Sequence, residues 1–109
     1  MKILYGFTET NKFLKRITGR ISDEEYAELQ FYICENPDEG DLIQGSGGLR
    51  KIRWHVGGKG KSGGVRVIYF HAVNLEKILM LDIYKKSEKS NMSKAEITAL
   101  RQTLKDWKR

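Results

Sequence analysis

The apolar positions of the chain change their spacing several times, and each change marks an expected element. Residues 3–7 form a short apolar run that is typical of a strand. Residues 11–17 repeat apolar side chains at helical spacing, and Gly19 follows as a stop signal. The stretch SDEE at residues 22–25 is a capping box, and Pro37 ends the helix that it starts. The first third is therefore predicted as a strand followed by two helices.

The middle of the chain changes to a period of two. In LRKIRWHV, the apolar residues alternate with Lys51, Arg53 and His55, which places these three side chains on one face of a strand. The stretches VRVIYFHAV and ILMLDIY are apolar at nearly every position, so they are predicted as central strands. Three consecutive strands are expected to form an antiparallel meander.

A third helix is predicted at the C-terminal end. SKAE at residues 93–96 is a second capping box, and Ile97, Leu100, Leu104 and Trp107 follow as one apolar stripe. The expected order is β-α-α-β-β-β-α, a single α+β domain over residues 1–109 with a small antiparallel sheet, two N-terminal helices and one C-terminal helix.

The glycine-rich stretch VGGKGKSGGVR, residues 56–66, contains the letters GKS of a phosphate-binding loop. A P-loop needs a glycine five positions before Gly60, where this chain has His55, and it needs a helix afterwards. Here a strand follows, so the stretch is predicted as the loop of a β-hairpin. Lys59 and Lys61 lie in that loop, where they are candidates to contact a nucleic-acid backbone.

Charge is distributed unevenly along the chain, whose net charge is +6. Eight of the fourteen acidic residues lie between positions 23 and 41, and none lies between 42 and 75. The acid-free window carries six cations: Arg50, Lys51, Arg53, Lys59, Lys61 and Arg66. This half of the molecule is expected to attract a polyanion such as RNA or DNA. The alternative is a solvated basic face with no partner.

The residues that are candidates for catalysis are cations. Lys51 and Arg53 stand about 7 Å apart on one strand face. Arg66 opens the next strand beside the glycine loop, so its truncation is expected to leave no cavity in the core. Other reaction types have little support, because His55 and His71 accompany no metal-ligand spacing and Cys34 is the single cysteine. No metal site, cofactor, signal peptide or membrane span is expected, and a cytoplasmic location follows by default.

At GGLRKIRW, GKGKSGGVRVIYF and LDIYKKSEKSNMS the sequence resembles the RelE/ParE toxin superfamily. It is most similar to the HigB-type, RelE-like toxins of bacterial type II toxin–antitoxin systems, over nearly the whole chain. The resemblance implies a RelE-like fold and an endoribonuclease that cuts messenger RNA in the ribosomal A site, inhibiting translation without a metal.

The resemblance also implies roles for individual residues. Lys51 and Arg53 match the basic pair that binds the substrate, and Arg66 matches the arginine that steadies the scissile phosphate. Lys89 falls near a cation that is proposed to act on the leaving group. Some relatives carry a tyrosine in the tail to orient the 2′-hydroxyl, where this chain has SNMS. Further candidate RNA contacts are the other basic residues of the region: Arg50, His55, Lys59, Lys61, Lys85 and Lys86.

The implied partners are the 70S ribosome with its messenger RNA and a cognate HigA-like antitoxin, expected to contain a helix-turn-helix. Operator DNA would be reached only through the antitoxin. Three alternatives remain open. The first is a ParE-like, non-catalytic inhibitor of DNA gyrase, although relatives of that kind usually lack the trio of Lys51, Arg53 and Arg66. The others are an inactive module that only binds antitoxin and a general nucleic-acid-binding domain.

Overall fold

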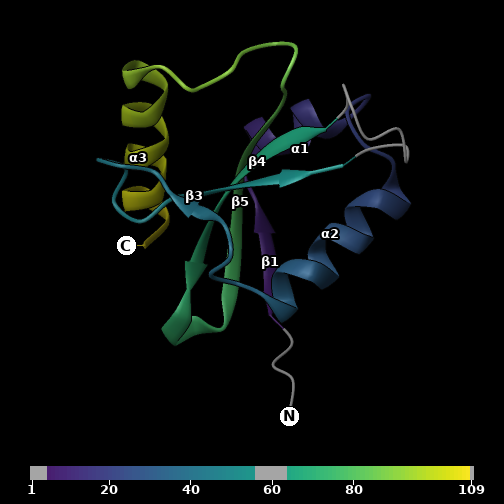
Figure 1. The fold of residues 1–109 in the computed structure, drawn as a ribbon. Helices are drawn as coiled ribbons and strands as arrows, with labels where there is room; N and C mark the ends of the chain where they lie inside the picture. Colours follow the sequence, from purple (N-terminus) through teal and green to yellow (C-terminus); the bar gives the residue numbers. More distant parts are fainter. Residues whose placement is uncertain (1–4, 56–63, 109) are drawn as a thin grey trace.

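A five-stranded sheet lies between helices in this computed structural model, which describes residues 5–55 and 64–108 (Figure 1). The spatial order of the strands is β1-β5-β4-β3-β2. The strands are β1 (Gly6–Glu9), β2 (Asp41–Leu42), β3 (Arg50–Trp54), β4 (Val65–Ala72) and β5 (Lys77–Lys85). The helices are α1 (Asn11–Ile17), α2 (Asp23–Glu35) and α3 (Lys94–Lys108), with a 3-10 turn, η1 (Val73–Leu75), between β4 and β5.

The α+β class and the antiparallel meander of β3, β4 and β5 are confirmed. The sheet as a whole is mixed, because β1 runs parallel to β5. Parallel neighbours need a long connection that returns the chain to its starting edge. Here the whole segment from α1 to β4 makes that return, so β1 pairs with the last strand and not with the next one.

Local signals at the helix ends are confirmed. The Glu25 amide donates to the Ser22 hydroxyl over 3.1 Å, and the Ser22 amide donates to the Glu25 carboxylate over 2.8 Å. Ser93 and Glu96 exchange the same two bonds at the start of α3. Helix α2 ends at Glu35, as the following Asn-Pro pair predicts.

Two strand boundaries differ from the expectation. β1 begins at Gly6, while part of the predicted strand at residues 3–7 lies outside the described residues. The stretch between Pro37 and Leu49, to which the sequence pattern assigned no element, contains the short strand β2, whose two residues pair with Arg50 and Lys51. The hairpin prediction is confirmed by the antiparallel pairing of β3 with β4. Its glycine loop, residues 56–63, lies outside the described residues.

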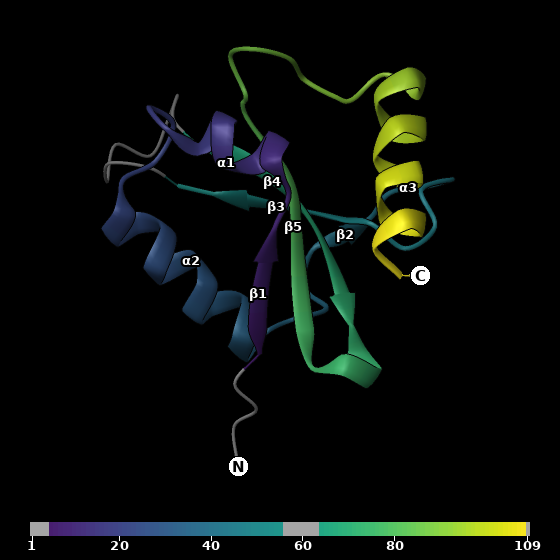
Figure 2. The same cartoon turned by 180° about the vertical axis from the view of Figure 1, so that it is seen from behind.

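The sheet separates two apolar layers. Helices α1 and α2 lie on one side and α3 on the other (Figures 1 and 2). The α1/α2 face contains, among others, Ile52, Val67 and Tyr69, and the α3 face contains Leu49, Ile68, Leu79, Leu81 and Tyr84. The predicted stripe of α3 contributes the buried Leu100 and Leu104. Successive residues of β4 therefore serve different helices, as a period of two requires.

Candidate functional site

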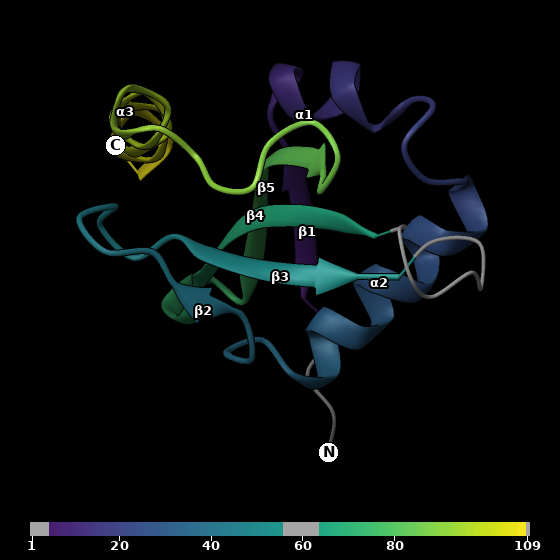
Figure 3. The same ribbon diagram turned by 45° about the horizontal axis from the view of Figure 1, so that its top comes forward.

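Strands β3 and β4 bring three cations onto the α3 face of the sheet. Lys51 and Arg53 are two residues apart in β3, and Arg53 lies directly opposite Arg66 in β4. The two strands run side by side in the sheet (Figure 3). Side chains of directly opposed residues share a face, with their Cβ atoms about 5 Å apart. We call Lys51, Arg53 and Arg66 the cationic face. The structure thus brings together the three residues that the sequence singled out.

Arg66 is much less exposed than its position at the start of a strand suggested. Only 9% of its surface is accessible. It lies between Arg53 and Tyr84, its direct neighbours on the two adjacent strands. Gly64, at φ +108°, precedes it, and a Cβ there would lie 3.7 Å from a terminal guanidinium nitrogen of Arg66. The residues of the flanking strands and the nearby glycine therefore leave the guanidinium little accessible surface.

The positive charge on this face is not neutralised by protein carboxylates. Within the described residues, neither Arg53 nor Arg66 forms an ion pair, whereas Arg16, Arg20 and Arg50 each do. Lys51 donates from Nζ to the amide oxygen of Asn91, at 3.3 Å. A largely buried guanidinium is costly unless an anion accompanies it. The arrangement fits a face that receives its anion from outside the chain.

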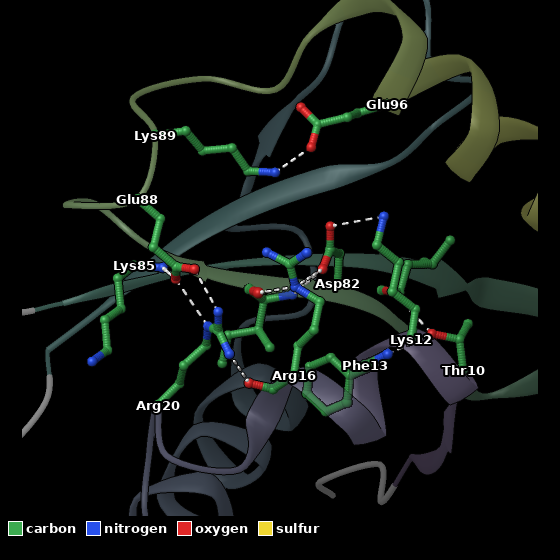
Figure 4. Close-up of polar contacts among 12 residues, drawn as sticks. Thr10, Lys12, Phe13, Arg16, Arg20, Asp82, Lys85, Glu88, Lys89 and Glu96 are labelled. Carbon is green, nitrogen blue, oxygen red and sulfur yellow. Dashed lines mark hydrogen bonds and ion pairs between the residues drawn. The ribbon is translucent and has the colours of Figure 1, made fainter.

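Lys89 reaches the same region from the loop between β5 and α3. Its Nζ lies 4.8 Å above the ring centroid of Tyr84 and forms an ion pair with Glu96 (Figure 4). The hydrogen bond from Lys89, helped by the backbone amide of Ser93, lowers the pKa of Glu96 to about 2. Lys89 is therefore near the cationic face, but a carboxylate already compensates its charge.

The turn that follows α1 anchors the start of that loop. The Arg20 guanidinium holds Glu88 through two contacts, one of them 2.9 Å from Nε to Oε1, and this lowers the pKa of Glu88 to about 2. The Lys85 amide donates to the same carboxylate at 2.7 Å. These contacts link the end of β5 to the turn after α1 (Figure 4). They position the segment from which Lys89 extends.

A second anchor is a carboxylate inside the strand that was read as apolar. Asp82 is fully buried in β5 and accepts a hydrogen bond from the Ile83 amide at 2.8 Å. Arg16 Nε lies 3.1 Å from one of its oxygens and Lys12 Nζ lies 3.6 Å from the other (Figure 4). Here the buried carboxylate has cationic partners within the chain, in contrast to the guanidinium groups of the cationic face.

Arg50 is the predicted RNA contact that the structure does not bring to this face. It lies opposite Tyr69, on the α1/α2 side. Its guanidinium donates to the backbone oxygens of Asp38 and Gly40, at 2.9 and 2.8 Å, and lies 3.7 Å from the Asp38 carboxylate. Arg50 therefore fastens the segment before β2 to the sheet.

The remaining candidate contacts are surface residues or lie outside the described part of the chain. His55 is exposed directly after β3, and Lys85 and Lys86 are exposed at the end of β5. Lys59 and Lys61 belong to residues 56–63. His55, Lys85 and Lys86 are thus accessible to a large partner, while the two loop lysines stay sequence predictions.

His71, the second histidine, is packed and hydrogen-bonded. Its Nδ1 lies 2.8 Å from Asp38, and its ring meets Tyr5 edge-on at 5.0 Å between centroids. Across residues 5–55 and 64–108, no three His, Cys, Asp or Glu side chains gather in a way that could hold a metal ion. Over the same residues, no helix has both the length and the apolar composition needed to cross a membrane.

The sequence interpretation missed three members of this region. Tyr84 was read as one more core residue of an apolar strand, and Glu96 only as part of a capping box. Asn91 carried no signal at all. From the sequence, Glu96 can be recognised only as a residue in the first turn of α3. The fold shows that the same carboxylate also binds Lys89.

Comparison with known proteins places these features in a family. Residues 8–109 match the family model described as the RelE toxin of the RelE/RelB toxin–antitoxin system. Among solved structures, a mutant E. coli toxin RelE in the free state is similar with a TM-score of 0.57 and 17% identity, covering 83% of this chain and 90% of that one. The intact E. coli RelBE toxin–antitoxin complex matches with a TM-score of 0.57 and 18% identity, covering 74% of this chain and 95% of that one. The chain belongs to the RelE toxin family.

Proposed function

We propose that this chain is the toxin of a type II toxin–antitoxin pair and that it cleaves messenger RNA in the ribosomal A site, within the cytoplasm. Family membership supports the toxin assignment. The observation that carries the nuclease assignment is Arg66, which is 9% exposed and without a carboxylate partner in the described chain. It lies beside Arg53, so two guanidinium groups converge where a phosphate can bind. Within the family, we assign the chain to the HigB-type branch.

The proposed reaction is attack of the 2′-oxygen on the adjacent phosphate, in which the bond from phosphorus to the 5′-oxygen breaks and the leaving 5′-oxygen gains, in net, the proton that the 2′-hydroxyl loses. The pentacoordinate transition state carries more negative charge than the phosphodiester, so fixed cations stabilise it more than the ground state. Arg66, held between two strands, is suited to form paired hydrogen bonds to two phosphate oxygens. Arg53 adds a second guanidinium on the same face. The step uses no metal ion or cofactor in this proposal.

Lys51 and Lys89 take the supporting roles. Lys51 binds the RNA backbone beside Arg53. Lys89 assists the leaving 5′-oxygen, for which it must exchange Glu96 for the substrate. The accessible cations His55, Lys85 and Lys86, together with Lys59 and Lys61, extend the contact to neighbouring phosphates and to the ribosome.

The test is cleavage mapping on ribosome-bound messenger RNA after brief induction, repeated with purified protein and programmed ribosomes. We expect growth arrest and cuts inside A-site codons, with a 2′,3′-cyclic phosphate on the upstream fragment. Intact messenger RNA together with loss of DNA supercoiling would identify a gyrase inhibitor. Normal growth under confirmed expression of folded protein would contradict the toxin assignment itself.

We also propose an antitoxin partner, HigA-like and containing a helix-turn-helix. The E. coli RelE toxin has been solved in complex with RelB, and the uncompensated cationic face of this chain suits an acidic covering segment, since opposite charge accelerates association. Operator DNA would be bound by the antitoxin. Co-expression with the neighbouring gene product should give a stable complex and restore growth. Absence of both would exclude that pairing.

A further inference from the structure

Tyr84 carries a buried hydroxyl with no hydrogen-bond partner. The residue has no accessible surface, and its Oη is one of the few buried side-chain atoms left unpaired in the described chain. Native proteins pair nearly all such groups, because an unpaired one destabilises the fold. Phenylalanine would fill the same space without that cost. The hydroxyl is therefore expected to find its hydrogen-bond partner in a bound ligand and not within the free protein.

The second buried tyrosine of the sheet shows what a structural hydroxyl looks like here. Tyr69, also without accessible surface, accepts from the Gly40 amide at 3.1 Å and donates to the Pro37 carbonyl at 2.9 Å. Both hydrogen-bonding capacities of that group are used. Tyr69 is thus a matched control for Tyr84, because it is a buried tyrosine of the same sheet whose hydroxyl has a structural role.

The surroundings of Tyr84 are those of the proposed reaction. It lies directly opposite Arg66 on the same sheet face, and Lys89 covers its ring with Nζ 4.8 Å from the centroid. Burial raises the pKa of Tyr84, against the opposing effect of Arg66, so the hydroxyl keeps its proton at neutral pH. A protonated hydroxyl near two cations can donate a hydrogen bond to an anion that these cations bind.

We propose that the Tyr84 hydroxyl is a substrate contact that donates a hydrogen bond to a non-bridging oxygen of the phosphate held by Arg66. The contact forms when the RNA phosphate replaces Glu96 as the partner of Lys89 and the lysine moves off the tyrosine ring. Both side chains of that ion pair are partly exposed, at 22% and 31%, so the exchange needs no opening of the core. This inference rests on the proposed nuclease function.

The experiment compares Tyr84→Phe with Tyr69→Phe and the wild-type chain. Single-turnover cleavage on saturating programmed ribosomes gives the rate of the chemical step, and thermal unfolding gives the stability of each protein. We expect Tyr84→Phe to cut about ten- to a hundredfold more slowly, the effect of one hydrogen bond to a charged group. Its melting temperature should equal or exceed that of the wild type, and its affinity for ribosomes should not change.

The control should behave in the opposite way. Tyr69→Phe leaves the Gly40 amide unpaired, so its melting temperature should fall by several degrees while the folded protein cuts at the wild-type rate. Wild-type cleavage by Tyr84→Phe would overturn the inference and leave the nuclease proposal standing. A parallel loss of melting temperature and rate would show a structural role and overturn it as well. If the wild-type chain cuts no messenger RNA, both the Tyr84 inference and the nuclease proposal are wrong.

Discussion

Arg50 and Arg66 lie in neighbouring strands of one sheet, yet their guanidinium groups differ in whether the fold provides partners for them. Arg50, on the α1/α2 face, donates to two backbone oxygens and lies near a carboxylate. Arg66, on the α3 face, has no such partner among the described residues, although only 9% of it is exposed. One arginine has its hydrogen bonds satisfied by the fold. The other has no carboxylate partner within the described residues.

Because of this difference, we expect Arg50 to contribute to the stability of the fold and Arg66 to function. A guanidinium with internal partners contributes to folding, and its loss leaves those partners unsatisfied. A buried guanidinium without an anion costs stability, and proteins retain such groups mainly at sites where a ligand supplies the missing charge. Substitutions on the two faces should therefore affect different measurements.

The largest expected effect is that of Arg66→Ala on cleavage. Removing one fixed transition-state contact typically costs about 3–4 kcal/mol, which is a rate loss of order 10²–10³. Arg66→Lys should recover only part of the rate, because an ammonium group cannot reproduce the paired hydrogen bonds of a guanidinium. Single-turnover cleavage on programmed ribosomes measures the effect, with circular dichroism as the folding control. A folded Arg66→Ala protein that cuts at the wild-type rate would exclude this residue from the reaction.

Arg50→Ala should mainly lower stability. Hydrogen bonds to a charged group contribute about 1.5–3 kcal/mol, so chemical denaturation should show a loss of that size. Cleavage per folded molecule should stay within about twofold of the wild type, since the side chain points away from the cationic face. A large rate loss with unchanged stability would mean that the two faces are not separate in function.

The smallest expected effect concerns the ion pair of Lys89 with Glu96. The pKa of Glu96 is lowered in the folded chain to about 2, below its usual value of about 4.3. The carboxylate therefore stabilises the fold above about pH 4.3, and this contribution is lost as the pH falls toward 2. The melting temperature of Glu96→Gln should lie slightly below that of the wild type at pH 7, and the two should converge near pH 2. A difference that does not change with pH would exclude the ion pair as its cause.

Much of the fold was predictable because its signals are local. The capping boxes at Ser22 and Ser93 are read from four residues each, and the meander follows from the period of two. The parallel pairing of β1 with β5 was not predictable, because it joins segments about seventy residues apart. Strand β2 was missed because two residues are too few to show a period.

The sequence predicted the site only for residues that can be placed by the period of two within a strand and by the pairing of the two strands of the hairpin. Lys51 and Arg53 share a face by spacing alone, and the hairpin brings Arg66 opposite Arg53. The partners of other charges could not be read in this way. Nothing local distinguishes Arg50, which is paired, from Arg53, which is not, and an aromatic residue in an apolar strand gives no hint that the Tyr84 hydroxyl is unpaired.

The most direct test of the central claim is a structure of this protein bound to a ribosome whose A-site codon carries 2′-O-methyl groups, which block the attacking oxygen. The account predicts that the scissile phosphate lies on the α3 face, within hydrogen-bonding distance of the Arg66 guanidinium, with Arg53 beside it and Lys89 released from Glu96. A messenger RNA lying against the α1/α2 face near Arg50, or a phosphate out of reach of Arg66, would contradict it.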